Sequence, residues 1–163
     1  MNAVSYTTAD IEELYDRYAD MLFRIAYAEL LKREDAEDAV QEVFFKYMSR
    51  PVSFREREHE KAWFIRVTVN VCHDMHRKRK KRDYTPIDQV THIPDAGEDG
   101  IGIISNVLSM PEKFKTVILL YYFEDMSVEE IGESLGLSKS AVKMRLARGR
   151  EYLKNDLGEG AEK

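Results

Sequence analysis

Apolar residues recur at intervals of three and four along most of this 163-residue chain, a period that predicts α-helices. The pattern indicates helices around residues 11–25, 36–47 and 58–82, and the second of them is expected to end before Pro51. A helical period returns over residues 105–157. The sequence shows neither the alternation of a strand nor an Asn-Gly hairpin signal, so we expect an all-α fold.

The helical pattern is interrupted between residues 83 and 104. This stretch has no Lys or Arg, and it contains five acidic residues, three glycines and two prolines. Such a composition is typical of a flexible acidic linker. We therefore predict two small helical domains, residues 1–82 and 105–157, joined by the linker at 83–104, with a short tail at 158–163.

Composition narrows the classes of function further. Hydrophobic residues make up 44% of the chain and charged residues 34%, which is typical of a globular protein. No apolar run approaches the ~18 residues of a membrane span, and no signal peptide is evident, so we expect a cytoplasmic protein without membrane insertion. The single cysteine, Cys72, excludes an internal disulfide and a cysteine zinc site. The sequence also lacks a phosphate-binding glycine loop, and we predict no catalytic, cofactor or metal site.

The predicted second helix separates its residues into two faces. Its apolar positions lie on one side, whereas Phe45 falls among acidic and amide residues on the other (Glu34, Asp38, Gln41 and Glu42). An aromatic residue ringed by charges favours a docking face for a basic partner. A solvated charged face with one exposed apolar residue is the alternative.

The predicted third helix carries a mixed stripe opposite its apolar side: Trp63, Arg66, Val67, Asn70, Asp74 and Arg77. Aromatic rings stack on bases, Asn bonds unpaired base edges and Arg neutralises phosphates, so this stripe favours binding of single-stranded nucleic acid. Phe54, in the preceding loop, is a further stacking candidate, and core packing is the alternative for Trp63. Six consecutive basic residues, 77–82, end the helix and indicate a polyanionic partner, with nucleic acid favoured over a membrane.

The most specific local signal is a helix-turn-helix. Ser127 and Glu130 are spaced as a capping box, Gly136 suits a left-handed helix end, and Ser138 is placed to cap the next helix. The second helix directs small and basic residues outward, with further cations on its flanks: Ser140, Lys143, Met144, Ala147 and Arg148, then Lys139, Arg145 and Arg150. This layout is typical of a recognition helix in the major groove. An ordinary αα-hairpin is the alternative.

Taken together, these motifs resemble the extracytoplasmic-function (ECF) group of bacterial sigma factors, the specificity subunits of RNA polymerase. Three segments carry the resemblance. Residues 35–46 (DAEDAVQEVFFK) are similar to the family's core-polymerase-binding helix, and residues 61–74 (KAWFIRVTVNVCHD) to its minus-ten-reading helix. Residues 108–153 are similar to its minus-thirty-five-reading domain.

The resemblance implies a role for each surface. It assigns core-polymerase binding to Asp35, Asp38, Gln41, Glu42 and Phe45. It assigns binding of the minus-ten element, including the melted non-template strand, to Phe54, Trp63, Arg66, Asn70, Arg77, Lys78 and Arg79. It assigns binding of the double-stranded minus-thirty-five element to Ser138, Lys139, Ser140, Lys143, Met144, Arg145 and Arg148.

The resemblance further implies a non-enzymatic protein without cofactors, whose partners are core RNA polymerase, promoter DNA and an anti-sigma factor that in some cases holds the sigma factor at the membrane. Two other classes remain alternatives. A stand-alone LuxR-like regulator has a similar helix-turn-helix, but it usually adds a sensor or receiver domain. A helical nuclease would use Asp35, Asp38 and Glu42 for a metal, without a second helix of ligands.

Overall fold

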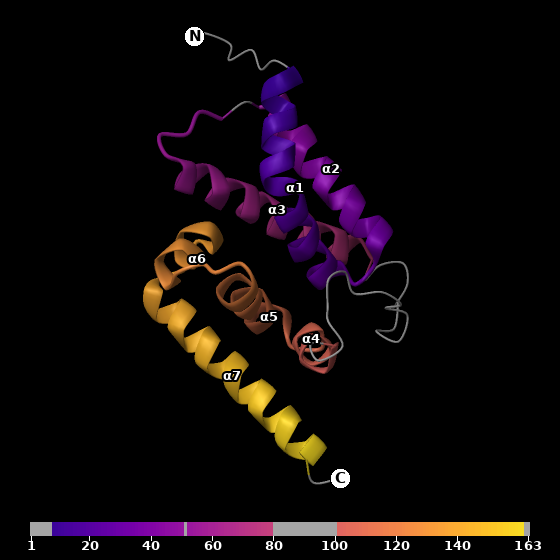
Figure 1. Cartoon of the computed structure of the whole chain (residues 1–163), viewed down its shortest axis with the longest axis vertical. Coiled ribbons are helices and arrows are strands. Elements are labelled where there is room, and N and C mark those ends of the chain that lie inside the picture. Colours follow the sequence, from indigo (N-terminus) through magenta and orange to yellow (C-terminus); the bar gives the residue numbers. More distant parts are fainter. Residues whose placement is uncertain (1–7, 51, 80–100, 162–163) are drawn as a thin grey trace. The chain divides into compact units, whose positions relative to one another are not determined.

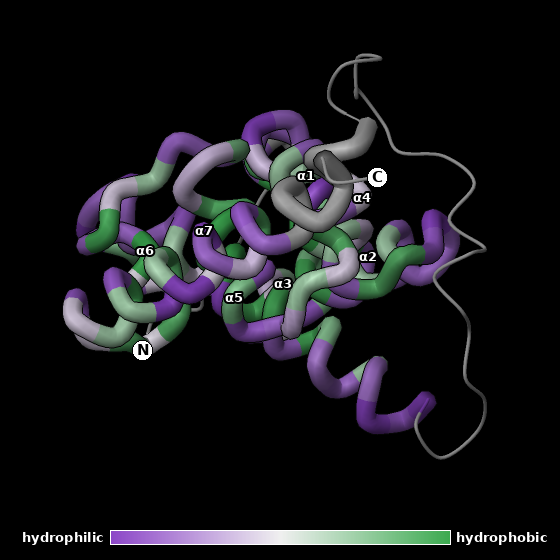
Figure 2. Tube along the Cα trace, turned by 90° about the horizontal axis from the view of Figure 1, so that it is seen from below, coloured by the Kyte–Doolittle hydropathy of each residue, from purple (hydrophilic) through white to green (hydrophobic). Residues whose placement is uncertain are grey.

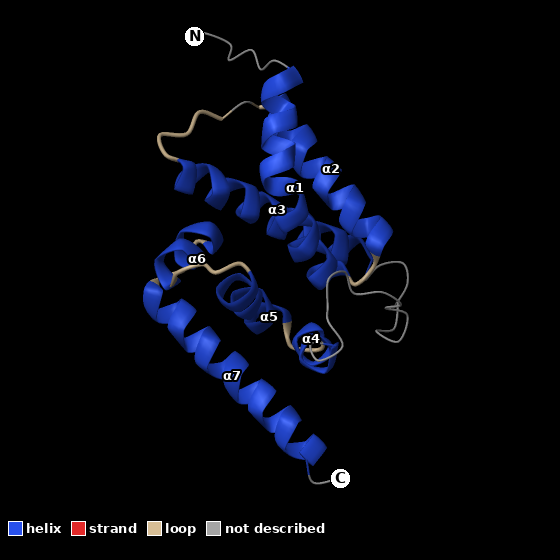
Figure 3. Cartoon of the chain, viewed as in Figure 1, coloured by secondary structure: helices blue, strands red, loops and turns tan. Residues whose placement is uncertain are grey.

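The computed structural model describes residues 8–50, 52–79 and 101–161, and in this part of the chain it contains helices and no strand (Figure 3). The described residues form two compact units, 8–79 and 101–161, each built of helices. The expected all-α class with two helical domains is therefore confirmed. The predicted linker lies outside the described residues up to residue 100, as do residues 80–82 of the basic run.

The first unit is a three-helix domain of α1 (Thr8–Leu30), α2 (Arg33–Ser49) and α3 (Arg57–Arg79) (Figure 1). Each helix packs against the other two. The chain turns sharply between α1 and α2 at Leu31, which has a φ of 58° and donates its backbone N–H to the carbonyl of Tyr27 at 2.7 Å. These helices match the three predicted ones in order and in place.

Aromatic packing fills the centre of this unit. Phe64 is fully buried, and its ring lies 4.9 Å from Tyr18, 5.4 Å from Phe44 and 5.3 Å from Tyr47. These rings bring together all three helices, so one side chain of α3 contacts both α1 and α2. Truncation of such a buried aromatic residue costs about 3–5 kcal/mol. The small unit is therefore held by a few large contacts.

The second unit contains α4 (Ile101–Leu108), α5 (Glu112–Ile118), a π-helical turn η2 (Leu119–Phe123), α6 (Val128–Leu135) and α7 (Lys139–Ala161). Both α5 and α6 pack against α7. Two boundaries differ from the sequence interpretation: α4 begins at Ile101 rather than at residue 105, and α7 continues beyond residue 157. Glycines at 102 and 158 suggested breaks, but the helices include both.

Figure 2 shows hydrophobic and hydrophilic positions interspersed along the longer helices, in keeping with the period read from the sequence. Hydrophilic residues predominate at the C-terminal end of α3, where the last turn carries His76, Arg77, Lys78 and Arg79. Within the described residues, no helix is both long and apolar enough to cross a membrane.

Candidate partner and nucleic-acid interfaces

The outward face of α2, defined as Asp38, Gln41, Glu42 and Phe45, is exposed as predicted. The opposite face is buried against α1 and α3 through Ala36, Val40, Val43, Phe44 and Tyr47. Phe45 stands out because 62% of its surface is accessible. A large aromatic side chain among carboxylates, held on a rigid helix, can bind a partner that offers both apolar and basic groups.

Asp35 differs from the other four residues assigned to polymerase binding. Its side chain is only 13% exposed and forms an ion pair with Arg79, which lies at the end of α3. The sequence had placed these two residues on separate surfaces, one for the polymerase and one for DNA. The structure brings them together, so one ion pair connects the start of α2 to the C-terminal residue of α3.

A groove between α1 and α2 adjoins this face and was not foreseen from the sequence. It has a volume of about 330 Å³, and its lining includes Tyr15, Phe23, Val40 and Gln41. Tyr15 is 51% exposed, while its ring centroid lies 5.2 Å from that of Phe44 in the core. An exposed aromatic position in α1, Tyr15, was the only sign of this groove in the sequence. A helical wheel of α2 alone cannot reveal a groove that α1 and α2 form together.

Trp63, Arg66 and Asn70 lie along one side of α3. Arg66 and Asn70 are exposed, whereas Trp63 is half-buried. Trp63 packs edge-on against Tyr47 at 5.6 Å and against Phe64 at 5.1 Å, and Phe54 lies 6.1 Å from it. One portion of Trp63 thus joins the core, as the packing alternative expects, and the rest remains accessible beside Phe54. Its role in stacking on bases stays a prediction.

The end of α3 presents a basic segment that is already partly paired. Arg77 forms an ion pair with Asp74 one turn earlier, and Arg79 with Asp35. Lys78 is exposed. A phosphate that contacts this segment must therefore compete with carboxylates of the chain itself.

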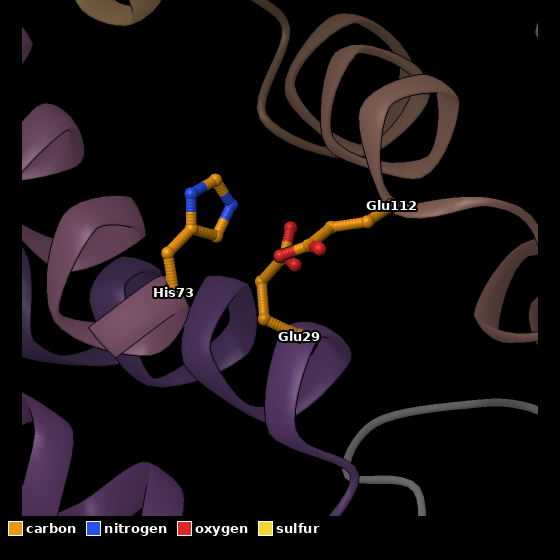
Figure 4. A group of neighbouring side chains, drawn as sticks. All are labelled: Glu29, His73 and Glu112. Atoms are coloured by element: carbon orange, nitrogen blue, oxygen red, sulfur yellow. The ribbon is translucent and has the colours of Figure 1, made fainter. Parts of the chain in front are cut away.

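The inner side of these last turns contacts α1. The His76 Nε2 atom lies 2.7 Å from the backbone carbonyl oxygen of Glu29. Figure 4 shows Glu29 projecting from α1 and His73 from α3. Glu112, drawn with them, lies on α5 in the other unit, so we assign no common site to the three side chains.

The helix-turn-helix of the second unit has the predicted caps. The backbone N–H of Ser127 donates to Glu130 Oε2 at 2.8 Å, and the N–H of Glu130 donates to Ser127 Oγ at 3.1 Å. Gly136 ends α6 in the left-handed conformation, with φ 68° and ψ 36°. The Ser138 hydroxyl then accepts from the backbone of Ala141 at 3.1 Å. Every element that the sequence proposed for this turn is therefore present.

The outward side of α7 carries the residues expected of a recognition helix. Val142 and Leu146 are buried, so the remaining predicted contacts point away from the unit. Six of them are exposed and Arg145 is half-buried; the exposed ones are Ser138, Lys139, Ser140, Lys143, Met144 and Arg148. Such a mixture of cations, hydroxyls and one apolar side chain suits contact with phosphates and base edges.

Two contacts around α7 were missed by the sequence interpretation. Lys139 forms an ion pair with Glu129 of α6, with 2.7 Å between Nζ and Oε1. Arg150, expected on the phosphate-binding flank, donates from Nε to the hydroxyl of Tyr122 at 2.7 Å and lies 5.7 Å from the ring centroid of Tyr121. The π-helical turn places both tyrosines near Arg150, and the apolar period alone gave no sign of it.

The comparisons with known proteins agree with this architecture. Residues 14–82 match the Sigma-70 region 2 family, and residues 107–153 match the Sigma-70 region 4 family. The two matches fall on the two helical units, and together they place the chain in the sigma-70 class of sigma subunits. Members of this class are transcription initiation factors.

Curated relatives define the group within that class. The chain is 30% identical to the ECF RNA polymerase sigma factor SigW of Bacillus subtilis, over 89% of this chain and 87% of SigW. It is also 30% identical to the RNA polymerase sigma factor SigV of the same organism, over 83% of each chain. The protein therefore belongs to the ECF RNA polymerase sigma factors.

A solved structure supports the fold. The sigma factor RpoE from Bartonella quintana, crystallised with the anti-sigma factor NepR, is 20% identical to this chain. It aligns with a TM-score of 0.78 over 93% of this chain and 98% of its own.

Proposed function

We propose that α2 docks this sigma factor on core RNA polymerase through its outward face, with Asp35 at the edge of that face. The exposed Phe45 among acidic residues is the observation that carries this assignment. The face offers an apolar anchor together with Asp38 and Glu42, so it suits a partner surface that is basic and partly apolar. The adjoining groove adds Tyr15 as a second exposed aromatic residue.

The same proposal assigns promoter binding to the other two surfaces. Phe54, Trp63, Arg66 and Asn70 would capture the melted minus-ten element, and the basic segment Arg77–Arg79 would hold nearby phosphates. The outward side of α7 would bind the duplex minus-thirty-five element. Support comes from the packing of Phe54 beside the half-buried Trp63. The two rings together form an aromatic platform of the kind on which bases stack.

Promoter opening then requires no reaction catalysed by this chain. Extrusion of a base costs a few kcal/mol, and a preformed pocket for that base offsets part of the cost. We infer that the chain is not an enzyme and that it selects and opens promoters through binding energy alone.

We also propose an anti-sigma factor as a third partner, and the cytoplasm, where the polymerase acts, as the location of this protein. The support is that the structural relative RpoE was crystallised with an anti-sigma factor. In this proposal the anti-sigma factor restrains the sigma factor, and an anti-sigma factor anchored in a membrane would hold the sigma factor there without any span in the sigma chain itself.

Run-off transcription tests the function as a whole. Purified core polymerase of the source organism is given genomic fragments with and without this protein. New transcripts that depend on the protein are expected, and alignment of their upstream sequences identifies both promoter elements. Active core enzyme and folded protein that yield no new transcript, together with no co-purification of the two, would contradict the proposal.

The docking face is tested by the double variant Asp38→Arg with Phe45→Ala. Loss of co-purification with core polymerase is expected because the variant removes the apolar anchor and reverses a charge. Both side chains are exposed, so the helical circular dichroism should be retained. Glu58→Arg, an exposed charge reversal on α3, is the matched control and should still bind. Retained binding by the double variant would refute the docking face.

The minus-ten surface is tested by Asn70→Ala. This variant should bind core polymerase normally yet reduce promoter opening, because it removes only the amide that would bond an unpaired base. Permanganate footprinting of the melted region reports the opening directly. An unchanged footprint would exclude Asn70 from this role.

A further inference from the structure

The ion pair between Glu129 and Lys139 connects the two helices of the helix-turn-helix, on the side that the proposed function assigns to DNA. Glu129 is the second residue of α6, and Lys139 is the first residue of α7. Their charged atoms lie 2.7 Å apart, and both side chains are well exposed, at 59% and 62% respectively. The pair is thus formed in water, where another anion can reach Lys139.

The position of each partner explains why the pair forms. Both residues lie at helix N-termini, where the aligned peptide dipoles favour a carboxylate and disfavour an ammonium group. Glu129 therefore stabilises Lys139 at a place that would otherwise repel it. The hydrogen bond from Lys139 in turn lowers the pKa of the Glu129 carboxyl.

Lys139 is one of the exposed cations that the proposed function places against the minus-thirty-five element. We propose that Glu129 acts as an intramolecular competitor of DNA phosphate for Lys139, and so limits the affinity of the helix-turn-helix for duplex DNA. This inference rests on the proposed function of α7. A phosphate and the Glu129 carboxylate both accept from the same ammonium group, and their negative charges repel each other, so the two contacts oppose one another.

The size of the effect follows from the exposure of the pair. Exposed ion pairs are weak, and their free energies correspond to changes in affinity of about 1.5-fold to 5-fold. Glu129→Gln should therefore tighten promoter binding by that factor. It should also make the salt dependence steeper, by at most the equivalent of about one further phosphate contact.

The test uses holoenzyme assembled from core polymerase and this chain, with a promoter fragment identified by the run-off experiment as the probe. Dissociation constants are measured over a series of salt concentrations for Glu129→Gln, Lys139→Gln and their double variant, and for Lys143→Gln and Arg148→Gln. Glu133→Gln is the matched control, since it removes an exposed carboxylate from the same helix one turn later. Thermal unfolding of each variant verifies the fold.

Tighter binding by Glu129→Gln than by Glu133→Gln, with the gain abolished in the Lys139→Gln background, supports the inference. An equal gain in both backgrounds, or none, overturns it because Glu129 then does not act through Lys139. Loss of affinity in Lys143→Gln and Arg148→Gln but not in Lys139→Gln overturns this inference and leaves the proposed function intact. Unchanged affinity in all three lysine and arginine variants overturns the proposed function of α7 itself.

Discussion

Gly149 sets the distance between α7 and α5. A Cβ atom at this position would lie 2.6 Å from Ile118 Cγ1 and 3.2 Å from Met110 Cε. Both neighbours are buried, so neither can move freely. The absence of a side chain at residue 149 is therefore a packing requirement, and it allows α7 to lie close to α5.

Gly149→Ala should lower the free energy of unfolding by about 1–3 kcal/mol because it overpacks this contact. Urea-induced unfolding followed by circular dichroism measures the loss. In an Ile118→Ala background, where the clashing atoms are absent, the same substitution should cost less.

Gly136→Ala provides the contrast. No atom lies within 4 Å of its added Cβ, but the residue has a φ of 68°. The substitution should lower the free energy of unfolding by about 1–2 kcal/mol because alanine is strained in this backbone conformation. This loss should be the same in the parent protein and in the Ile118→Ala background. If the Ile118→Ala background reduced the destabilisation by Gly149→Ala and by Gly136→Ala equally, the packing explanation for Gly149 would be contradicted.

Tyr18 introduces a pH dependence into the first unit. Burial, assisted by its hydrogen bond to Glu60 at 2.8 Å, raises the pKa of Tyr18 from 10.0 to about 12. The neutral phenol is thus favoured in the folded state, so this contribution to stability is fully present below pH 10 and is lost as the pH rises from 10 to about 12.

Tyr18→Phe should therefore be less sensitive to alkali over that interval, although it loses the bond to Glu60 at neutral pH. Unfolding free energies measured across the interval test this expectation. Since the chain has nine tyrosines, the informative quantity is the difference in slope between the variant and the parent protein. Parallel slopes would show that Tyr18 titrates as in the unfolded chain.

At the level of the elements, the ion pair of Asp35 and Arg79 fastens the end of α3 to the start of α2. Asp35→Asn should loosen the last turn of α3 and speed the hydrogen exchange of its amides about fivefold, the equivalent of about 1 kcal/mol. Arg79→Gln should have the same effect, and the double variant should add little.

Asp74→Asn is the control for this contact, because its partner Arg77 lies on the same helix. The loss of such a local pair should change exchange by less than a factor of about 2.5. If Asp35→Asn speeds the hydrogen exchange of these amides no more than Asp74→Asn does, the ion pair between α2 and α3 does not stabilise the last turn of α3.

The helices and their outward faces could be predicted because each depends only on the spacing of apolar residues within one stretch of sequence. Phe45 is exposed and Val40 is buried for the same reason: 100° per residue places them on different sides of α2. The caps at Ser127 and Gly136 were likewise local, since their spacing alone specifies the turn.

Contacts between helices could not be predicted in this way. The pairs Asp35–Arg79 and Glu129–Lys139 depend on how two helices meet, which a single-helix wheel does not contain. The π-helical turn at Leu119–Phe123 also escaped, because one additional residue per turn changes the apolar period too little to notice over five residues. The exposure of most residues in each candidate surface was thus predictable, but the carboxylates that pair with its cations were not.

For the whole molecule, the two surfaces that we propose bind DNA lie in separate helical units, and each is small. A net charge of −5 and the internal carboxylate partners both weaken the attraction of the free chain for DNA. Strong binding therefore requires both surfaces to act on one promoter. Once core polymerase fixes their separation, the second contact becomes intramolecular, and selectivity rises without any new contact.

This reasoning predicts a different response to promoter spacing for the holoenzyme and the free chain. Insertion of about 5 bp between the two elements turns them to opposite faces of the duplex, and insertion of about 10 bp restores the face but adds about 34 Å. Both insertions should abolish transcription by the holoenzyme, because neither restores both angle and distance. The free chain, whose units are not held by polymerase, should bind all three fragments with equal and weak affinity in a mobility-shift titration. If the free chain were as sensitive to promoter spacing as the holoenzyme, its two units would hold a fixed separation without polymerase. Polymerase would then not be the cause of the cooperation between the two DNA contacts.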